Sequence, residues 1–249
     1  MENILSYDEM VVMKKTGAFA ARILAQVKKI MKPGTSTKDV ETFFDKTLKE
    51  YPHMYAAFKG YNNYPSSLCV SVNEEIIHGI PSAQRVLKAG DLVSVDLGIK
   101  HQGLFVDTAY TYAIGIPTPL ARKLINVCKN ALGEAVKRVK IGARIGDIGS
   151  TVQTFVEKHG FSVIRNFVGH GIGRVLHCYP EVPNFGEKNT GEILREGMVL
   201  AIEPMISSGS YEVEILSDGW TAKTKDNSLS CHFEHTVAVT KRGAWVLTQ

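Results

Sequence analysis

Two aspartates interrupt the apolar alternation of two consecutive predicted strands. Asp96 lies in the strand predicted at 91–99, and Asp107 lies in the strand predicted at 104–114. A hairpin centred between positions 101 and 102 places the two carboxylates directly opposite each other. Like charges at such positions have Cβ atoms about 5 Å apart and destabilise a sheet. The pattern therefore predicts that a cation lies between them.

An internal repeat extends this pair of acids to four. KAGDLVSVDLGI is echoed by REGMVLAIEPMI, which aligns Asp96 with Glu203, and GLFVDTAYT is echoed by SCHFEHTVAV, which aligns Asp107 with Glu234. Each acid alone could be exposed or paired with Lys or Arg, but four at symmetric positions favour metal ions, because unpaired buried carboxylates are heavily penalised. Carboxylate oxygens suit Co, Mn, Fe(II) or Zn, and acids with one imidazole are typical of paired-metal hydrolases.

One histidine is expected to complete the ligand set. His170 lies between glycines in VGHGIG, where the backbone can approach a ligand closely. The alternatives are a flexible glycine loop or a degraded phosphate loop, and no βαβ unit with an acidic partner follows to support the second. His78 and His177 could line the same cleft without binding metal. His235 is expected on the opposite strand face from Glu234. The other histidines are expected in turns, at helix ends or on strand surfaces: His53, His101, His159 and His232.

Length, composition and charge restrict the class of protein. The chain has 249 residues, of which 44% are hydrophobic and 22% are charged, with a net charge of +4. These values are typical of a globular protein, and no concentrated basic patch supports nucleic acid as the sole partner. The cysteines are widely spaced, which favours a reducing cytoplasm. Neither a signal-peptide pattern nor a run of 18 apolar residues occurs, so secretion and membrane insertion are not expected.

Four helices and eight strands are expected to position these residues. A capping-box pattern from Ser6 to Glu9 begins a long helix that stops at Pro33 and Gly34. The other helices are predicted at 39–50, 120–139 and 147–159. Strands are predicted at 68–72, 91–99, 104–114, 161–168, 198–205, 211–216, 232–240 and 245–247. The helices repeat with the strands, so we expect one catalytic domain, 1–249, with pseudo-symmetric parts at roughly 34–115 and 142–240.

Several motifs resemble those of bacterial type I methionine aminopeptidases, in the order in which that family has them. They are YPSSLCVSVNEEIIHGIP, GDLVSVDLG, GLFVDTAYTY, GHGIGRVLH, GMVLAIEPM and DGWTAKTKDNSLSCHFEHTVAVT. The resemblance implies the α/β pita-bread fold, in which two similar halves curve an antiparallel sheet around the site with helices on its outer face. It also implies that five residues hold two divalent metal ions, with Asp107 and Glu234 bridging the pair. The implied ligands are Asp96, Asp107, His170, Glu203 and Glu234.

The same resemblance implies an activity, which is removal of the N-terminal methionine from nascent polypeptides whose second residue is small. The chemistry expected is two-metal activation of a bridging water, with Glu203 as general base. His78 and His177 are expected to hydrogen-bond the scissile peptide. The methionine pocket should be apolar and polarizable, and each candidate could instead be ordinary core. The candidates are Phe58, Tyr61, Tyr64, Cys69 and Trp220.

Departures from the family pattern affect substrate preference more than chemistry. Cys178 stands where many members carry an acidic residue, and Phe58 and Leu176 occupy variable positions. Two alternatives are weaker: a proline-specific peptidase of this fold, which usually carries a large N-terminal domain, and a binding module that has lost its metal ligands. We expect a cytoplasmic monomer that does not enter membranes, and transient ribosome association stays open.

Overall fold

Four α-helices are present in residues 4–249, which are the residues that this computed structural model describes. They are α1 (Tyr7–Ile30), α2 (Thr37–Lys49), α3 (Pro119–Val136) and α4 (Ile145–Lys158). All four match the predicted ranges to within a few residues at each end. The predicted capping box is confirmed at α1, where the Ser6 hydroxyl accepts from the Glu9 amide and the Glu9 carboxylate accepts from the Ser6 amide.

The strands form four antiparallel sheets within the described residues. The first part of the chain contributes β1 (Met54–Ala56), β2 (Cys69–Val72), β3 (Glu75–Ile77), β4 (Leu92–His101) and β5 (Leu104–Ala113). The second part contributes β6 (Ser162–Val163), β7 (Gly169–Gly171), β8 (Cys178–Val182), β9 (Val199–Ile202), β10 (Met205–Ser207), β11 (Val213–Ile215), β12 (Ala222–Thr224), β13 (Ser230–His232), β14 (His235–Thr240) and β15 (Gly243–Val246). The sheet orders are β1-β4-β2 with β5 on β4, β13-β10-β6, β11-β12-β3, and β15-β14-β9-β7-β8.

Three strands predicted as continuous are shortened or interrupted in the structure. The strand predicted at 161–168 forms only the two-residue strand β6, and the one predicted at 198–205 is interrupted between β9 and β10. Pro204 lies at that break and has no amide to donate to a ladder. The strand predicted at 232–240 is likewise broken before β14. The sequence prediction missed β1, β3, β7, β8 and β12, which are all short.

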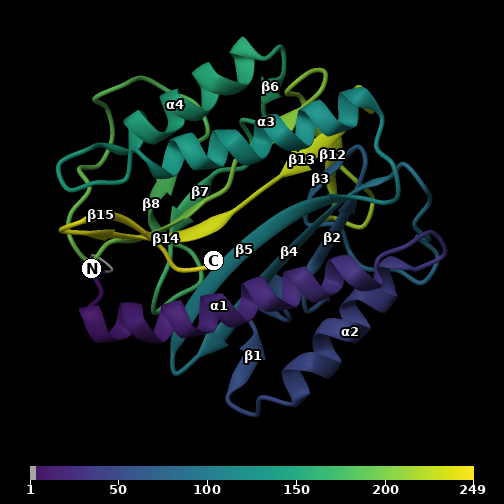
Figure 1. Cartoon of the computed structure of the whole chain (residues 1–249), viewed down its shortest axis with the longest axis horizontal. Helices are drawn as coiled ribbons and strands as arrows, with labels where there is room; N and C mark the ends of the chain where they lie inside the picture. Colours follow the sequence, from purple (N-terminus) through teal and green to yellow (C-terminus); the bar gives the residue numbers. More distant parts are fainter. Residues whose placement is uncertain (1–3) are drawn as a thin grey trace.

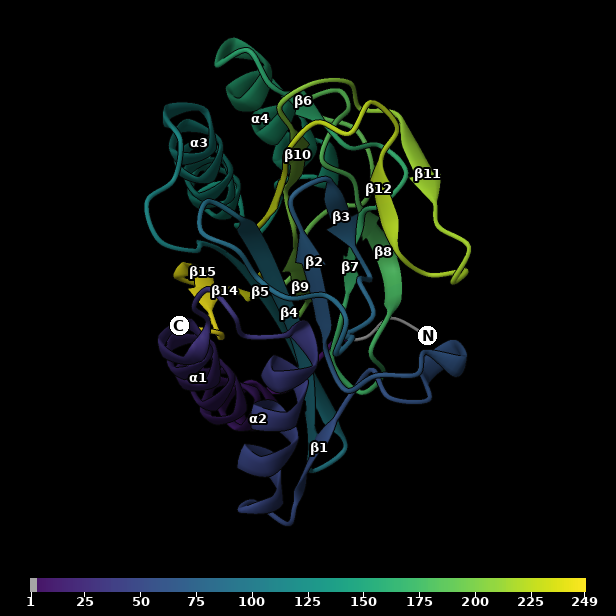
Figure 2. The ribbon, with the colours of Figure 1, turned by 90° about the vertical axis from the view of Figure 1, so that its right-hand side faces the viewer.

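The helices pack in two pairs against the strands. Figure 1 shows α1 and α2 below β4 and β5, with α3 and α4 above them, and Figure 2 shows the helices to one side of β7, β8, β11 and β12. Met13 and Ile23 of α1 share a buried cluster with Phe44 of α2 and with Leu97 and Ile99 of β4. Burying each such side chain contributes about 1.5–3 kcal/mol. Within residues 4–249, no helix is both long and apolar enough to cross a membrane.

The segments before α2 and α4 make equivalent backbone contacts. The amide of Gly34 donates to the Leu87 carbonyl at 2.9 Å, and the amide of Gly142 donates to the Leu194 carbonyl at 2.9 Å. All four glycines of the two aligned turns, 34, 90, 142 and 197, have positive φ. We propose that these contacts reflect the internal repeat; that the two parts form a single catalytic domain stays a prediction.

Side-chain hydroxyls join β5 to the break between β13 and β14. The Thr236 hydroxyl donates to the Asp107 carbonyl at 2.7 Å and accepts from the Asp107 amide at 2.9 Å. The Thr108 hydroxyl donates to the Glu234 carbonyl at 2.9 Å, and the Glu234 amide donates to the Ala109 carbonyl at 2.9 Å. These four bonds hold Asp107 and Glu234 side by side although they are far apart in sequence.

Gly98 is the position on β4 where added volume should be most harmful, because a Cβ there would lie 2.6 Å from Cε1 of Phe58 and 2.9 Å from Cβ of Ala57. We expect Gly98→Ala to lower the free energy of unfolding by about 1–3 kcal/mol, since the buried Phe58 ring must move. The matched control is Gly133→Ala in α3, where a Cβ meets none of the described residues outside its own helix backbone within 4 Å. That variant should be stabilised by about 0.5–1 kcal/mol. Urea unfolding measures both, and equal effects would contradict the packing described for β4.

Candidate metal centre

The register of the β4–β5 hairpin differs from the predicted one. Asp96 lies opposite Ala109, and Asp107 lies opposite Gly98. The predicted direct pairing of the two aspartates is therefore wrong. They are diagonal neighbours on the same face of the sheet. Their Cβ atoms are still close enough for the two carboxylates to approach each other. The repulsion predicted from the sequence survives the change of register.

The turn of the hairpin explains this difference. Gln102 and Gly103 close it, with φ angles of 51° and 78°. Two consecutive residues with positive φ form the type I′ turn, whose twist matches that of the flanking strands. The hairpin centre therefore lies one residue later than predicted. Both strands shift together, so the side chains keep their faces.

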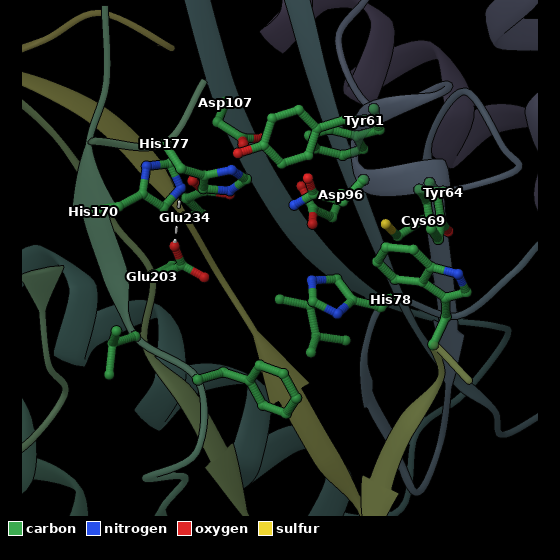
Figure 3. A pocket seen from close by; sticks show the side chains of 16 residues that line it. Tyr61, Tyr64, Cys69, His78, Asp96, Asp107, His170, His177, Glu203 and Glu234 are labelled. Atoms are coloured by element: carbon green, nitrogen blue, oxygen red, sulfur yellow. Dashed lines mark ion pairs between the residues drawn. The ribbon is translucent and has the colours of Figure 1, made fainter. Parts of the chain in front are cut away.

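The five predicted metal ligands converge from both parts of the chain (Figure 3). Asp96 lies on β4 and Asp107 on β5, His170 lies on β7, and Glu203 and Glu234 lie at the two strand breaks. Three sets of donor atoms each lie within 4.8 Å of one another: Asp96, Asp107 and Glu234; His170, Glu203 and Glu234; and Asp107, His170 and His177. The sets overlap, so the side chains form one continuous cluster.

The cluster has ligand atoms that could bind a cation, but no positively charged side chain among the described residues pairs with its acids. Within residues 4–249, no Lys or Arg forms an ion pair with any of the four acids. Oδ1 of Asp96 and Oε1 of Glu234 are buried without a hydrogen-bond partner. Buried acceptors without partners are rare and costly, and metal ions satisfy them. Divalent metal ions therefore fit this site.

Burial raises the pKa of all four carboxyls in the metal-free protein, and neighbouring negative charges raise it further for Asp96, Glu203 and Glu234. For Asp107 burial raises the pKa to about 7. For Asp96 and Glu234 the pKa rises well above the usual range because of burial first and then the charge of Asp107, and Glu203 behaves in the same way. A bound cation would reverse these shifts, since it favours the ionised form.

His170 is oriented as a metal ligand. Its Nδ1 lies 3.0 Å from the Gly171 carbonyl, and a carbonyl can only accept, so Nδ1 carries the hydrogen. The Nε2 lone pair then faces Oε1 of Glu203 at 3.6 Å, as the dashed line in Figure 3 marks. Burial lowers the pKa of His170 to about 3, which keeps the ring neutral. The Nε2 lone pair and a carboxylate oxygen at this distance can together bind one divalent cation.

His78 and His177 both line the cavity beside the carboxylates, and His177 also belongs to the donor set of Asp107 and His170. His78 has a φ of 61°, an uncommon conformation for a residue with a side chain and one that concentrates at functional sites. Its ring lies 5.4 Å from the ring of Phe167 and 6.1 Å from that of Trp220, and burial lowers its pKa to about 4. The exposed His177 ring lies 4.0 Å from that of His170.

A cavity of about 380 Å³ opens beside the cluster. All five predicted pocket residues line it, and the prediction missed Ile77, Asn62, Phe167 and Val168. Cys69 lies directly opposite Asp96 across β2 and β4, and the Tyr64 hydroxyl donates to the Gly79 carbonyl at 3.1 Å. The cavity thus has aromatic walls and a thiol, with the carboxylates at one end. It has the size and polarity to hold an apolar side chain.

His232 is a correction to the sequence prediction, which put it in a turn, at a helix end or on a strand surface. It is 1% exposed on β13, and its Nε2 lies 3.9 Å from Oε2 of Glu203. The sequence signal that could have placed His232 near the cluster was its spacing from Glu234, because residues two apart in a strand share a face. His235, in contrast, bonds to Thr248 through Nδ1 and belongs to none of the donor sets found in the described chain.

Three comparisons place the chain among known proteins. Residues 11–241 match metallopeptidase family M24. Methionine aminopeptidase A of Synechocystis sp. is 43% identical over 98% of this chain and 96% of its own length. Methionine aminopeptidase 1 of Bacillus subtilis is 43% identical, with 97% and 96% covered. The crystal structure of a methionine aminopeptidase from Thermotoga maritima has a TM-score of 0.98 at 46% identity and covers 100% of both chains.

Asp96→Asn should stabilise the metal-free protein at pH 8. The folded state holds protons on these carboxyls that the unfolded chain releases near pH 4, so the free energy of unfolding should fall as pH rises from about 4 through 7. Removing one acid relieves that repulsion, and we expect Tm to rise by about 2–4 °C per kcal/mol gained. Thermal unfolding with chelator at pH 5 and pH 8 measures this, and Mn²⁺ calorimetry should show weaker binding. A metal-free variant that melts well below wild type at pH 8 would show that the acids are structural partners.

Proposed function

The chain belongs to metallopeptidase family M24, and we propose on that premise that it is a metal-dependent aminopeptidase that removes N-terminal methionine. The likeness to the solved structures confirms the pita-bread α/β fold that the family resemblance implied. The observation that carries the proposal is the position of the carboxylate cluster at one end of an apolar cavity. A side chain held in that cavity would present its own backbone to the cluster.

Divalent metal ions are the cofactor, and the five predicted ligands have the donor atoms to hold them. We propose that Asp107 and Glu234 would be shared between two ions. Asp107, Glu234 and His170 each belong to two of the three donor sets, but a carboxylate has two oxygens to offer, whereas His170 has one free nitrogen. When bound, such ions act as Lewis acids and lower the pKa of water. The oxygen-rich donor set with one imidazole suits Mn, Fe(II), Co or Zn.

Glu203 is the proposed general base. It accepts a proton from the attacking water and returns it to the leaving amine, which requires a carboxylate at the edge of the cluster with an accessible oxygen. Glu203 lines the cavity, and its backbone is held by Asn184, whose Nδ2 donates to the Glu203 carbonyl at 3.0 Å. His78 and His177 line the same cavity, and we propose that they hydrogen-bond the scissile peptide.

The methionine side chain is proposed to lie among the aromatic rings and the thiol. Tyr61 packs 5.0 Å from the His177 ring, and Tyr64 packs 5.1 Å from the Trp220 ring, edge to face. Phe58 and Cys69 complete this wall. A thioether makes favourable contacts with aromatic rings and fills irregular apolar space. These contacts support methionine over a charged first residue.

The substrates proposed are nascent polypeptides in the cytoplasm, because the relatives named above are methionine aminopeptidases. The monomeric state and a transient ribosome association stay predictions. Incubation of the purified protein with Met-Ala-Ser and Met-Lys-Ser, with and without chelator, tests the activity directly. Release of methionine from the first peptide only, and only without chelator, would support the proposal; no release from either would contradict it.

His177→Ala should lower turnover much more than metal content, because this exposed imidazole is placed at the substrate. We expect about a hundredfold loss of kcat, within the range for removing one transition-state donor. His170→Ala should lower both metal content and turnover, since it removes a ligand. Metal analysis of the dialysed proteins together with steady-state kinetics separates the two roles. Equal metal loss in the two variants would mean that the roles are assigned incorrectly.

Cleavage should fall as the second residue grows. That residue lies beside His78 and His177 when the scissile carbonyl is at the cluster, and a misplacement of about 1 Å can cost about a hundredfold in rate. Glycine, alanine and serine leave the peptide free to enter, whereas lysine, leucine and phenylalanine would displace it. The measurement is kcat/KM for Met-X-Ser with X from glycine to phenylalanine. A flat series, or one ordered by charge at equal volume, would refute the steric account.

A further inference from the structure

His232 is a buried histidine whose ring has no hydrogen-bond partner among the described residues. It is 1% exposed, and neither Nδ1 nor Nε2 has a donor or acceptor within bonding distance. A buried polar group without a partner costs about 1–3 kcal/mol in protein mutational data. An apolar residue of similar size would avoid that cost, so the imidazole needs an explanation beyond filling space.

The backbone of His232 is held firmly beside Glu203. The Thr111 hydroxyl accepts from the His232 amide at 2.9 Å and donates to the His232 carbonyl at 2.7 Å. In the sheet, His232 lies opposite Met205, two residues after Glu203. The position of the ring is therefore set by β5 and β10, which also border the metal centre.

The Glu203 carboxylate lies between two imidazoles. Its Oε1 is 3.6 Å from Nε2 of His170, and its Oε2 is 3.9 Å from Nε2 of His232. Nε2 of His170 carries a lone pair, so Oε1 lies on the side where a cation would bind. His232 does not line the cavity, so it approaches Oε2 from outside the cavity.

The chemistry of a neutral imidazole suits this place. A neutral imidazole has one N–H donor and one acceptor. A donor at Nε2 complements the carboxylate, whereas an acceptor there would repel it. A small rotation of either side chain, or one bridging water, closes the gap of 3.9 Å.

We propose that His232 is a positioning residue that donates from Nε2 to Oε2 of Glu203 and so directs Oε1 toward the metal ions. The inference rests on the proposed function, in which Glu203 is both ligand and base. A carboxylate oxygen has two lone pairs, so Oε2 can accept from His232 and still take the proton of the attacking water. Partners behind a metal ligand typically change metal affinity or activity 10- to 100-fold.

The test compares side chains of similar length that differ in the donor. His232→Gln keeps an N–H donor, whereas His232→Met and His232→Leu fill the space without one. We expect Mn²⁺ titration calorimetry of the metal-free proteins to show about 10- to 100-fold weaker binding in the two apolar variants. The glutamine variant should stay within about threefold of wild type. With Met-Ala-Ser, kcat should follow the same order while KM changes little.

The control is His159→Met, at the end of α4 and remote from the cluster, which should bind Mn²⁺ as wild type does. Wild-type Mn²⁺ affinity in both apolar variants would overturn the inference, as would equal weakening in the glutamine and apolar variants, which is the result expected of a packing role. Calorimetry uses no peptide, so it decides the role of His232 even if wild type cleaves no Met-Ala-Ser. In that case the proposed aminopeptidase activity is refuted, and the Mn²⁺ affinities alone decide whether His232 positions Glu203.

Discussion

The mutual repulsion of four buried carboxylates is the interaction on which the rest of this structure depends. The acids Asp96, Asp107, Glu203 and Glu234 are each 7% exposed or less, and two of their oxygens have no partner in the described chain. Either protonation or bound cations can relieve that repulsion. The raised pKa values of the carboxyls correspond to relief by protonation. Such a site lowers the stability of the metal-free fold so that divalent ions bind where chemistry is needed, a trade-off common at functional sites.

The fold opposes this repulsion with hydrogen bonds from the backbone around the acids. The threonine hydroxyls at 108 and 236 tie β5 to the second part of the chain, so Asp107 and Glu234 cannot separate without breaking four bonds. Asp96 and Asp107 lie within continuous strands, whereas Glu203 and Glu234 lie at strand breaks. From these breaks, Glu234 reaches Asp96 and Asp107 on the other sheet, and Glu203 reaches His170 on β7.

Buried imidazoles serve different purposes around the same cluster because their surroundings differ. His170 has its hydrogen fixed on Nδ1 by a carbonyl and faces the acids with a lone pair. His78 packs between aromatic rings beside the cavity and keeps an uncommon backbone conformation. His232 lies behind Glu203 and outside the cavity. All three have a lowered pKa, so each ring is neutral and offers one donor and one acceptor.

Local patterns in the sequence determined the four helices, the Ser6 capping box and the faces of Asp96 and Asp107. These features depend on periodicity and on neighbours a few residues apart, which a sequence displays directly. Only the tertiary structure decided the hairpin register, because it depends on two positive φ angles at Gln102 and Gly103. The strand break at Glu234 and the burial of His232 were also decided there, since both residues bond to threonines more than a hundred positions away. The break at Glu203 instead adjoins Pro204, which the sequence displays directly.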